Sequence, residues 1–220
     1  AIAPAIYPHR IVGNKMNTIG SYAMGLFTVT NQTGAKGLIA NNVIGGNQIS
    51  NTGYGIYMSG NTNFMVHHNS ANLNAAGSTA TQYAGIYITG GSGISIMNNN
   101  LARTASGMGM PLYLATATVS DTCDYNNYFK VDTASGLIYK SITYFPANYR
   151  TAQGKDSNSI SNPPGFLSAL NLNINVPCNK GIALPVVPTD ITGLARSITA
   201  PNMGAYEMQA LNNNIGIERI

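Results

Sequence analysis

The sequence predicts an all-β solenoid, in which short strands form coils that stack on one another along a common axis. A phrase of glycine, an aliphatic residue and an aromatic residue recurs about every 30 residues, as Gly25-Leu26-Phe27, Gly55-Ile56-Tyr57 and Gly85-Ile86-Tyr87. A second series consists of asparagines that lie 28, 27, 30 and 27 residues apart: Asn14, Asn42, Asn69, Asn99 and Asn126. Repeats of roughly 20–50 residues indicate stacked structural units.

The best-preserved repeat contains two short strands. In Gly85–Gly90, apolar residues alternate with other residues between bounding glycines, which is typical of a strand, and Ile94–Asn99 shows the same alternation. No stretch between the strands keeps a helical period over about ten residues, and this excludes βαβ units, whose crossover needs a helix. Two or three strands per repeat, joined by turns, predict coils stacked about 4.8 Å apart. A β-propeller is the main alternative, but its blades run to about 40 residues and have four strands.

Stacked coils place equivalent residues in columns. The inward column at the repeated phrase is Leu26, Ile56, Ile86 and Leu112. The asparagine series predicts a column at a turn, whose amides hydrogen-bond from coil to coil and satisfy buried polar groups without charge. The outward column is aromatic and consists of Phe27, Tyr57, Tyr87 and Tyr113. We expect this column either to stack its rings between coils or to present a flat surface to sugar rings or to a neighbouring domain.

The repeat pattern weakens after residue 130, which divides the chain into three regions. Residues 1–130 are expected to form coils, and we expect further coils or a partner upstream of residue 1, because Ile11–Asn14 already resembles a coil and nothing before it resembles a cap. Residues 131–207 are richer in proline and are expected to form the last coils and a cap over the open end of the stack, where strand edges would otherwise be bare. Residues 208–220 indicate a linker towards a following module.

The repeat resembles the right-handed parallel β-helix of the pectate-lyase-like superfold. The C-terminal third adds motifs: Asp190–Arg196 with Pro201–Glu207 resembles the D-x-D-G-x-x-R … D-I-G-A-Y-E ending of secreted "choice-of-anchor Q" β-helix proteins of Bacteroidota. Asp121–Asn126 is similar to the S-D-Y-N turn of that family, and Gly154–Ile160 to its G-x-D-x-x-S-I segment. The resemblance implies a β-helical part of a large secreted or cell-surface bacterial protein, followed by immunoglobulin-like modules.

Two positions depart from the pattern of that family. Thr192 and Asn202 stand where the family usually has aspartate, so any cation site built on those acids is expected to be lost here. Arg196 and Glu207 are retained, and we expect them to form an ion pair within the cap. The motif is therefore interpreted as structural.

Acidic residues are too few on the coils for the chemistry that this superfold often hosts. Residues 1–120 contain no Asp or Glu, whereas glycoside hydrolysis normally needs two carboxylates and a calcium-dependent lyase needs an oxygen cage. Asp121 and Asp124 flank a turn and are expected to cap backbone amides. The adjacent His67 and His68 point to opposite faces of a strand, so we expect His67 to face solvent, His68 to join the asparagine turn, and no metal site or cofactor.

Charge and hydropathy exclude two further classes of partner. The net charge of +4 reflects scarce acids, and the 11 Lys and Arg are scattered singly rather than clustered as nucleic-acid binding requires. No run of about 18 apolar residues exists, so we expect no membrane insertion.

Two kinds of covalent modification are compatible with the sequence. Cys123 and Cys178 either form a disulfide in an oxidising compartment or remain separate buried thiols, because only their distance decides. Thr133, within Asp132-Thr133-Ala134, resembles the O-glycosylation signal of Bacteroidota.

These observations favour a non-catalytic structural, spacer or adhesive segment of a secreted or cell-surface protein. Its expected partners are neighbouring domains of the same long polypeptide, and extracellular glycans or other surface proteins. One alternative is a carbohydrate-binding module that uses the aromatic column. Another is a partial polysaccharide lyase whose active coils lie outside this chain.

Overall fold

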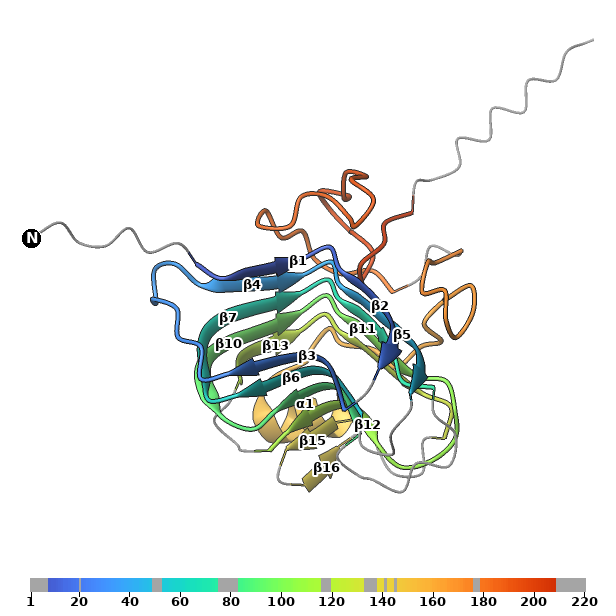
Figure 1. Cartoon of the computed structure of the whole chain (residues 1–220), viewed down its shortest axis with the longest axis horizontal. Coiled ribbons are helices and arrows are strands. Elements are labelled where there is room, and N and C mark those ends of the chain that lie inside the picture. Colours follow the sequence, from blue (N-terminus) through green and yellow to red (C-terminus); the bar gives the residue numbers. More distant parts are fainter. Residues whose placement is uncertain are drawn as a thin grey trace, which may run out of the picture.

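The protein is a three-sided β-solenoid (Figure 1). The computed structural model describes residues 8–19, 21–48, 53–74, 83–115, 120–132, 138–140, 142–144, 146–175 and 179–208. Within the described residues, the chain passes five times around three parallel sheets, with one strand per sheet on each pass. Consecutive strands therefore lie in different sheets and every third strand pairs, until a final antiparallel strand is added to the third sheet. This arrangement confirms the predicted fold class, a parallel β-helix.

We name the sheets A, B and C in the order in which the chain enters them. Sheet A contains β1 (Arg10–Val12), β4 (Gly37–Ala40), β7 (Asn61–His67), β10 (Gly91–Met97) and β13 (Ser120–Asp124). Sheet B contains β2 (Lys15–Ile19), β5 (Val43–Gln48), β8 (Ser70–Asn72), β11 (Asn100–Arg103) and β14 (Asn127–Lys130). Sheet C contains β3 (Tyr22–Phe27), β6 (Tyr54–Ser59), β9 (Ala84–Ile88), β12 (Met110–Leu114), β15 (Ile138–Lys140) and the antiparallel β16 (Ile142–Tyr144).

The interior of the solenoid is filled by apolar columns that run through the parallel registers. On sheet A, Ile39, Val66 and Ile96 lie in register and are fully buried. On sheet C, Ile56, Ile86 and Leu112 form the expected inward column, and all three are fully buried. The β3 strand is offset: Met24 pairs with Ile56, whereas Leu26 pairs with Met58. The prediction that Leu26 begins this column is therefore wrong by two residues, although Leu26 still faces the core because two residues preserve the alternation of faces.

In two of its three occurrences, the glycine of the repeated phrase is required by close approach between coils. A Cβ atom on Gly55 would overlap the carbonyl oxygen of Gly85, and a Cβ on Gly85 would lie 2.9 Å from the carbonyl oxygen of Pro111. The recurrence of glycine therefore reports backbone packing within sheet C.

The C-terminal part of the chain covers one end of the solenoid and then two of its sides. The helix α1 (Pro146–Gln153) places the fully buried Tyr149 in the main core beside Tyr144. We name residues 154–208 the C-terminal segment. It was expected to close the open end of the stack, but most of it runs along the outside of sheets A and B, as Figure 1 shows in orange and red. The segment follows this course because outward apolar residues of β4 and β5 pack against Val187 and Leu172.

Candidate functional site

The five expected asparagines form one continuous ladder at the corner between sheets A and B. From Asn42 onwards, the side-chain oxygen of each asparagine accepts two hydrogen bonds from the asparagine of the preceding coil, one from its backbone N–H and one from its side-chain amide. The eight distances lie between 2.9 and 3.1 Å for the series Asn14, Asn42, Asn69, Asn99 and Asn126. The ladder has a direction, because donors point towards the C-terminal end.

Each buried rung also binds the coil before it. The side-chain amide of Asn69 donates to the Ile39 carbonyl at 3.0 Å, and that of Asn99 donates to the Val66 carbonyl at 2.8 Å. At the C-terminal end the ladder terminates on Ser159, whose hydroxyl accepts from the Asn126 backbone N–H at 2.9 Å. The ladder therefore satisfies the polar groups of a corner in which four of the five asparagines are fully buried.

A second column at this corner was not predicted. The residue before every ladder asparagine has a positive φ angle, between 52° and 77°, and the column consists of Gly13, Asn41, His68, Asn98 and Tyr125. Left-handed backbone favours glycine and asparagine, and these types occupy three of the five positions. The signal was present in the sequence as an Asn or Gly directly before a ladder asparagine, but His68 and Tyr125 obscure it.

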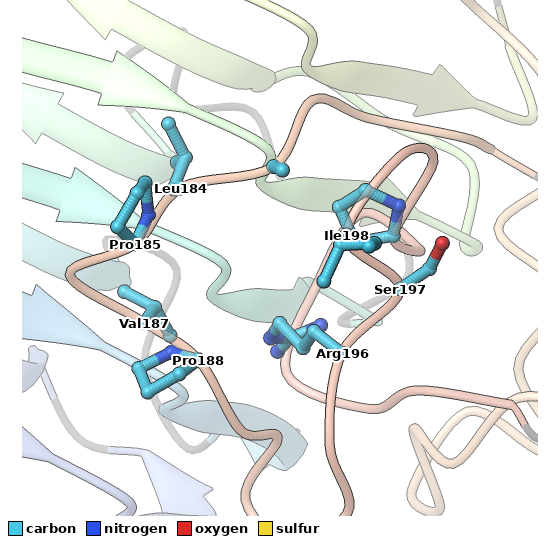
Figure 2. Close-up of a pocket in the computed structure, with 9 residues that line it drawn as sticks. Leu184, Pro185, Val187, Pro188, Arg196, Ser197 and Ile198 are labelled. Atoms are coloured by element: carbon cyan, nitrogen blue, oxygen red, sulfur yellow. The ribbon is translucent and has the colours of Figure 1, made fainter.

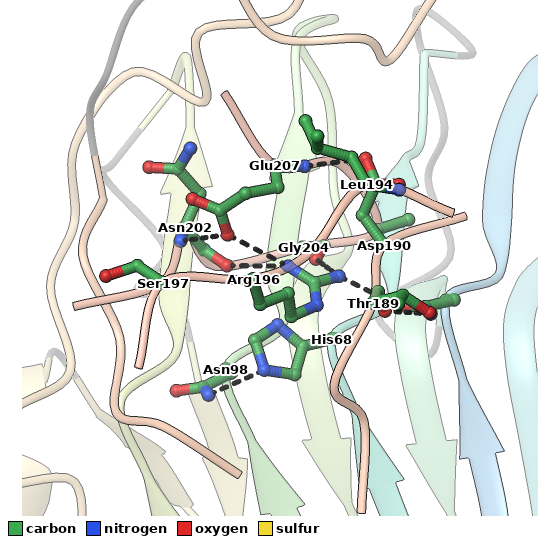
Figure 3. A network of polar contacts seen from close by, with 12 residues as sticks. His68, Asn98, Thr189, Asp190, Leu194, Arg196, Ser197, Asn202, Gly204 and Glu207 are labelled. Atoms are coloured by element: carbon green, nitrogen blue, oxygen red, sulfur yellow. Dashed lines mark hydrogen bonds and ion pairs between the residues drawn. The ribbon is translucent and has the colours of Figure 1, made fainter. Parts of the chain in front are cut away.

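The C-terminal segment binds this second column directly (Figure 3). The Arg196 guanidinium donates to Asn41 Oδ1 at 2.7 Å, and Asn41 Nδ2 donates to the Thr189 carbonyl at 2.8 Å. Asn98 bonds Ile182 twice, accepting from its N–H at 3.1 Å and donating to its carbonyl at 2.6 Å. Two coils are thereby tied to a segment more than 80 residues away in the sequence.

His68 lies between these two anchor points and is neutral. It is fully buried, and its Nε2 accepts a hydrogen bond from Asn98 Nδ2 at 2.9 Å (Figure 3). Burial, followed by the nearby positive charge of Arg196 and a smaller contribution from His67, lowers the pKa of His68 well below its ordinary value. A ring nitrogen that accepts a hydrogen bond and a lowered pKa both indicate that the His68 ring is neutral. The ring lies at the asparagine turn, as expected.

The C-terminal segment contains the ion pair that was expected between Arg196 and Glu207. Arg196 Nη1 lies 3.5 Å from Glu207 Oε2, and both side chains are almost fully buried. Arg196 also donates to the Gly204 carbonyl at 2.9 Å. Burial lowers the pKa of Arg196 to about 10, against the opposing effects of Glu207 and Asp190, so its charge persists at neutral pH.

Asp190 and the two positions that depart from the family pattern serve the local fold. Asp190 Oδ1 accepts from the Thr192 N–H at 2.7 Å, the Thr192 hydroxyl at 2.7 Å and the Leu194 N–H at 2.9 Å. Asn202 Oδ1 accepts from Lys180 Nζ at 2.7 Å, and the Asn202 N–H donates to Glu207 at 3.0 Å. These atoms hold the loops of the C-terminal segment together.

The outward aromatic column lies on sheet C, but its first member differs from the prediction. Tyr57, Tyr87 and Tyr113 are in register. Phe27 pairs with Ser59 instead, and Gly25 stands opposite Tyr57. This correction follows from the two-residue offset of β3. Phe27 still touches the column, with its ring centroid 5.4 Å from that of Tyr57, and Tyr22 and Tyr54 complete the cluster.

The tyrosine rings of this column stack face to face on one another. Tyr57 and Tyr87 stack with an interplanar angle of 8°, and Tyr87 and Tyr113 with an angle of 14° and centroids 4.6 Å apart. Tyr87 and Tyr113 are only 6% and 8% exposed, whereas Tyr22 and Phe27 on the first coil are 46% and 56% exposed. A platform for sugars needs open ring faces, so only the first-coil end of the column has the geometry for one.

Further polar residues that the sequence singled out have structural contacts. His67 was expected to face solvent, but it is 4% exposed, and its Nε2 lies 3.0 Å from Ser95 Oγ. The C-terminal segment lies over the outer face of sheet A, where Val187 is packed, and this burial lowers the pKa of His67 to about 4, with a smaller contribution from Lys36. Asp124 Oδ1 accepts from the backbone N–H groups of Tyr125 and Asn158 at 2.9 and 2.7 Å.

The thiol of Cys123 is free and belongs to a buried polar cluster at the C-terminal end. It lies 3.3 Å from the hydroxyl of Tyr128, which donates to Asp156 Oδ1 at 2.9 Å. Burial raises the pKa of Cys123 and of Tyr128 well above their ordinary values, so both stay protonated. Cys178, Thr133, the side chain of Asp121 and the linker residues 209–220 lie outside the described residues.

An apolar cavity of about 290 Å³ lies within the C-terminal segment (Figure 2). Leu184, Pro185, Val187, Pro188, Ile198 and Pro201 form most of its wall. Arg196 is the charged residue of the lining, and its guanidinium is engaged by Asn41 and Gly204. The cavity therefore offers mainly apolar contact, and the Ser197 hydroxyl in its lining accepts from the backbone N–H groups of Thr199 and Ala200.

The described part of the chain contains neither a cluster of metal ligands nor a membrane-spanning helix. Across the residues that the structure describes, no three His, Cys, Asp or Glu side chains are grouped closely enough to hold a metal ion. Within that same part, no helix has the length and apolarity needed to cross a membrane.

Comparison with known proteins addresses the fold. A family model described as a right-handed β-helix region matches residues 10–169. Comparisons with curated proteins and with solved structures found no match. The matched region includes every strand of sheets A, B and C, from β1 to β16, together with α1. With more than half of its length matched and its three parallel sheets in place, the chain belongs to the right-handed β-helix family.

Proposed function

We propose that this protein is a non-catalytic structural segment, a spacer or adhesive β-helix of a large secreted or cell-surface bacterial protein. The observation that carries the proposal is the use of its carboxylates. Asp124, Asp190 and Glu207 accept hydrogen bonds from backbone N–H groups, and Asp156 accepts from two buried hydroxyls. Carboxylates held in this way are unavailable as the paired acid and base that glycan cleavage requires.

The outer surfaces support the same proposal. Two sides of the solenoid are packed under the C-terminal segment, and the third side stacks its tyrosines on one another. A chain with 8% charged residues and uncharged ladders derives its rigidity from coil-to-coil contacts that do not depend on salt. Such a rod suits the spacing of neighbouring domains in one long polypeptide, which we propose as its main partners.

Secretion and surface location rest on the resemblance of the C-terminal motifs to surface β-helix proteins of Bacteroidota. The buried Arg196–Glu207 pair gives those motifs a role in joining the last loops of the C-terminal segment. Extracellular glycans remain secondary partners in this proposal, because the stacked tyrosines leave open ring faces only at Tyr22 and Phe27.

The experiment that tests the proposal is a polysaccharide turnover assay on the purified protein. Uronate-containing and neutral polysaccharides are incubated with the wild-type chain, and new reducing ends and unsaturated sugar products are measured. We expect none above the buffer blank. Turnover that disappears in Asp121→Asn or Asp132→Asn, but persists in a Lys36→Gln control, would overturn the non-catalytic proposal, since neither aspartate is among the four carboxylates described above.

A further inference from the structure

The first coil, formed by β1, β2 and β3, is the edge of all three sheets at once. Each of these strands stands at one end of its sheet and pairs only with the second coil, through β4, β5 and β6. In the described part of the chain no strand pairs with their other edge. A row of unpaired N–H and C=O groups on three consecutive strands is a template for a further strand on each side of the solenoid. We name this surface the first-coil face.

The apolar columns also end uncovered on the first-coil face. Ile11 is in register with Ile39, which is fully buried, yet Ile11 is only half-buried although it packs against the same core. Met16 likewise is half-buried beside the fully buried Ile44. The difference within each column comes from position alone, because the residue types are apolar throughout. Covering these side chains would remove apolar surface from water.

The asparagine ladder specifies the chemistry of the missing neighbour. Every rung from Asn42 onwards accepts two hydrogen bonds from the coil before it. Asn14 donates to Asn42 in the same way, but its own Oδ1 accepts no hydrogen bond within the described residues, and its side chain is exposed. The partner that completes the ladder is therefore an asparagine that donates its backbone N–H and its side-chain amide to Asn14 Oδ1.

The aromatic column ends on the same coil. Tyr22 stacks on Tyr54 with an interplanar angle of 18°, and the ring of Phe27 lies against Tyr57. Both first-coil rings are about half exposed, whereas Tyr87, which has a ring on either side in the stack, is 6% exposed. The first-coil face therefore exposes ring surface of Tyr22 and Phe27, whereas the equivalent surface in the interior coils is buried.

These four features are the strand edges, the apolar columns, the asparagine ladder and the aromatic column. From them we propose that the first-coil face is an interface for one further parallel β-helix coil with an asparagine at the corner between sheets A and B. The coil-to-coil interface is repeated four times inside the chain, and the first-coil face continues it with the same backbone edges, apolar residues, acceptor and rings. The proposal does not depend on whether the protein is catalytic.

A second copy of this chain fits the first-coil face less well. Two first-coil faces brought together would place the Asn14 oxygens opposite each other, acceptor against acceptor, and would pair their strands antiparallel. The opposite end of a second copy is covered by α1 and by residues around Asp156 and Ile160. A parallel coil with a donating asparagine would pair the strand edges, cover the apolar and aromatic columns and complete the asparagine ladder without moving any of these elements.

The test adds such a coil to the chain from Arg10 onwards, where it takes the place of residues 1–9. A copy of residues 38–64 is fused directly before Arg10. In the native chain Met65 follows this stretch and pairs with Leu38, and Arg10 likewise pairs with Leu38 of the next coil. Arg10 in the fusion therefore stands where Met65 stands in the native chain, opposite the copied Leu38. The asparagine copied from Asn42 then lies 27 residues before Asn14, the spacing that separates Asn42 from Asn69. Hydrogen exchange of the amides in β1, β2 and β3 and the thermal midpoint Tm are measured for the parent and the fusion.

We expect the fusion to slow exchange of first-coil amides at least tenfold and to raise Tm. The matched control carries one extra glycine between the copied Phe64 and Arg10, which moves every side chain of the added strand to the opposite face. A second control replaces the asparagine copied from Asn42 by alanine. Both should lose most of the protection, the first more than the second.

Two results would overturn the proposal. One is equal protection of first-coil amides in the parent, the in-register fusion and the glycine-shifted fusion. The other is a parent chain that is already a stable dimer by analytical ultracentrifugation, with its first-coil amides protected in a concentration-dependent way, because that would assign the first-coil face to a second copy. A fusion that folds poorly still gives a reading, since exchange is compared at individual amides of the parent part.

Discussion

The two ends of the solenoid differ in how their columns are closed. At the C-terminal end each sheet meets another segment: the Asp156 N–H donates to the Cys123 carbonyl of β13, Ile160 pairs with Asn127 of β14, and β16 pairs with β15. At the first coil, the strands of all three sheets pair on one side only within the described chain. The same columns are therefore buried at the C-terminal end and half-buried or exposed at the first coil.

This difference separates the contribution of a residue type from that of its position. Asn126 and Asn14 are the two ends of one ladder, yet Asn126 is fully buried beneath Ser159 and Asn14 is exposed. A hydrogen bond contributes most where a lost partner leaves a buried group unsatisfied. Identical substitutions should therefore have unequal effects along a column, and the ratio measures how completely each end is closed.

The largest effect is expected from the interior of the ladder. Asn99→Ala removes the acceptor of two buried Asn69 donors and the donor to the Val66 carbonyl, so we expect a loss of about 4 kcal/mol in the free energy of unfolding. Asn14→Ala removes one donor at an exposed rung and should lose about 1 kcal/mol or less. Urea denaturation of both variants measures the two losses. Equal losses would contradict the view that the ladder is open only at the first coil.

The closing helix provides the next largest difference. Tyr149→Ala leaves a cavity under α1 where a fully buried ring packs into the core, and such truncations lose about 3–4 kcal/mol. Ile11→Ala, on the half-buried first coil, should lose about 1 kcal/mol. Denaturation curves with unchanged slopes would show that both act on stability alone. A Tyr149→Ala loss no larger than that of Ile11→Ala would mean that α1 does not close its end.

The parts of the molecule that repeat were predictable from the sequence, and those that depend on distant segments were not. The asparagine ladder was found because one residue type recurs at 27–30 residues and has one geometric use. The place of Phe27 was wrong because β3 and β6 are related by 32 residues, from Tyr22 to Tyr54, while the neighbouring sheet-A strands are related by 28, from Arg10 to Leu38. A corner of variable length shifts the register of one sheet without changing the repeated phrase.

The burial of His67 shows the second limit. Strand alternation places its side chain outward, and outward residues of a half-buried strand are normally solvated. The C-terminal segment covers this face with residues more than 110 positions later in the chain. No local sequence pattern near His67 predicts that this segment packs there. The left-handed column was missed for the opposite reason, since its signal is local but two of its five members are neither glycine nor asparagine.

The covered middle of the stack should also be sensitive to acid. The pKa of His67 is about 4 in the folded protein, lowered mainly by burial, against about 6.5 when unfolded. The unfolded chain therefore binds more protons between these values, and stability is lost as pH falls from about 6.5 to 4, by roughly 3 kcal/mol. His67→Gln removes this titration. The wild-type chain should lose more stability than the variant between pH 7 and pH 4, and parallel pH profiles would contradict the burial of this ring.

The smallest expected difference lies along the aromatic column. Tyr87→Leu keeps an apolar side chain but removes two stacked ring contacts, each worth about 0.5–1.5 kcal/mol, so the loss should be about 1–2 kcal/mol. Phe27→Leu, on the exposed first coil, should change stability by about 0.5 kcal/mol or less. In the fusion with an added parallel coil, the Phe27→Leu loss should grow towards that of Tyr87→Leu, because the added coil would cover this ring. If it stays the same in the parent and the fusion, the aromatic column does not continue across the first-coil face, even where the ladder and the strand edges do.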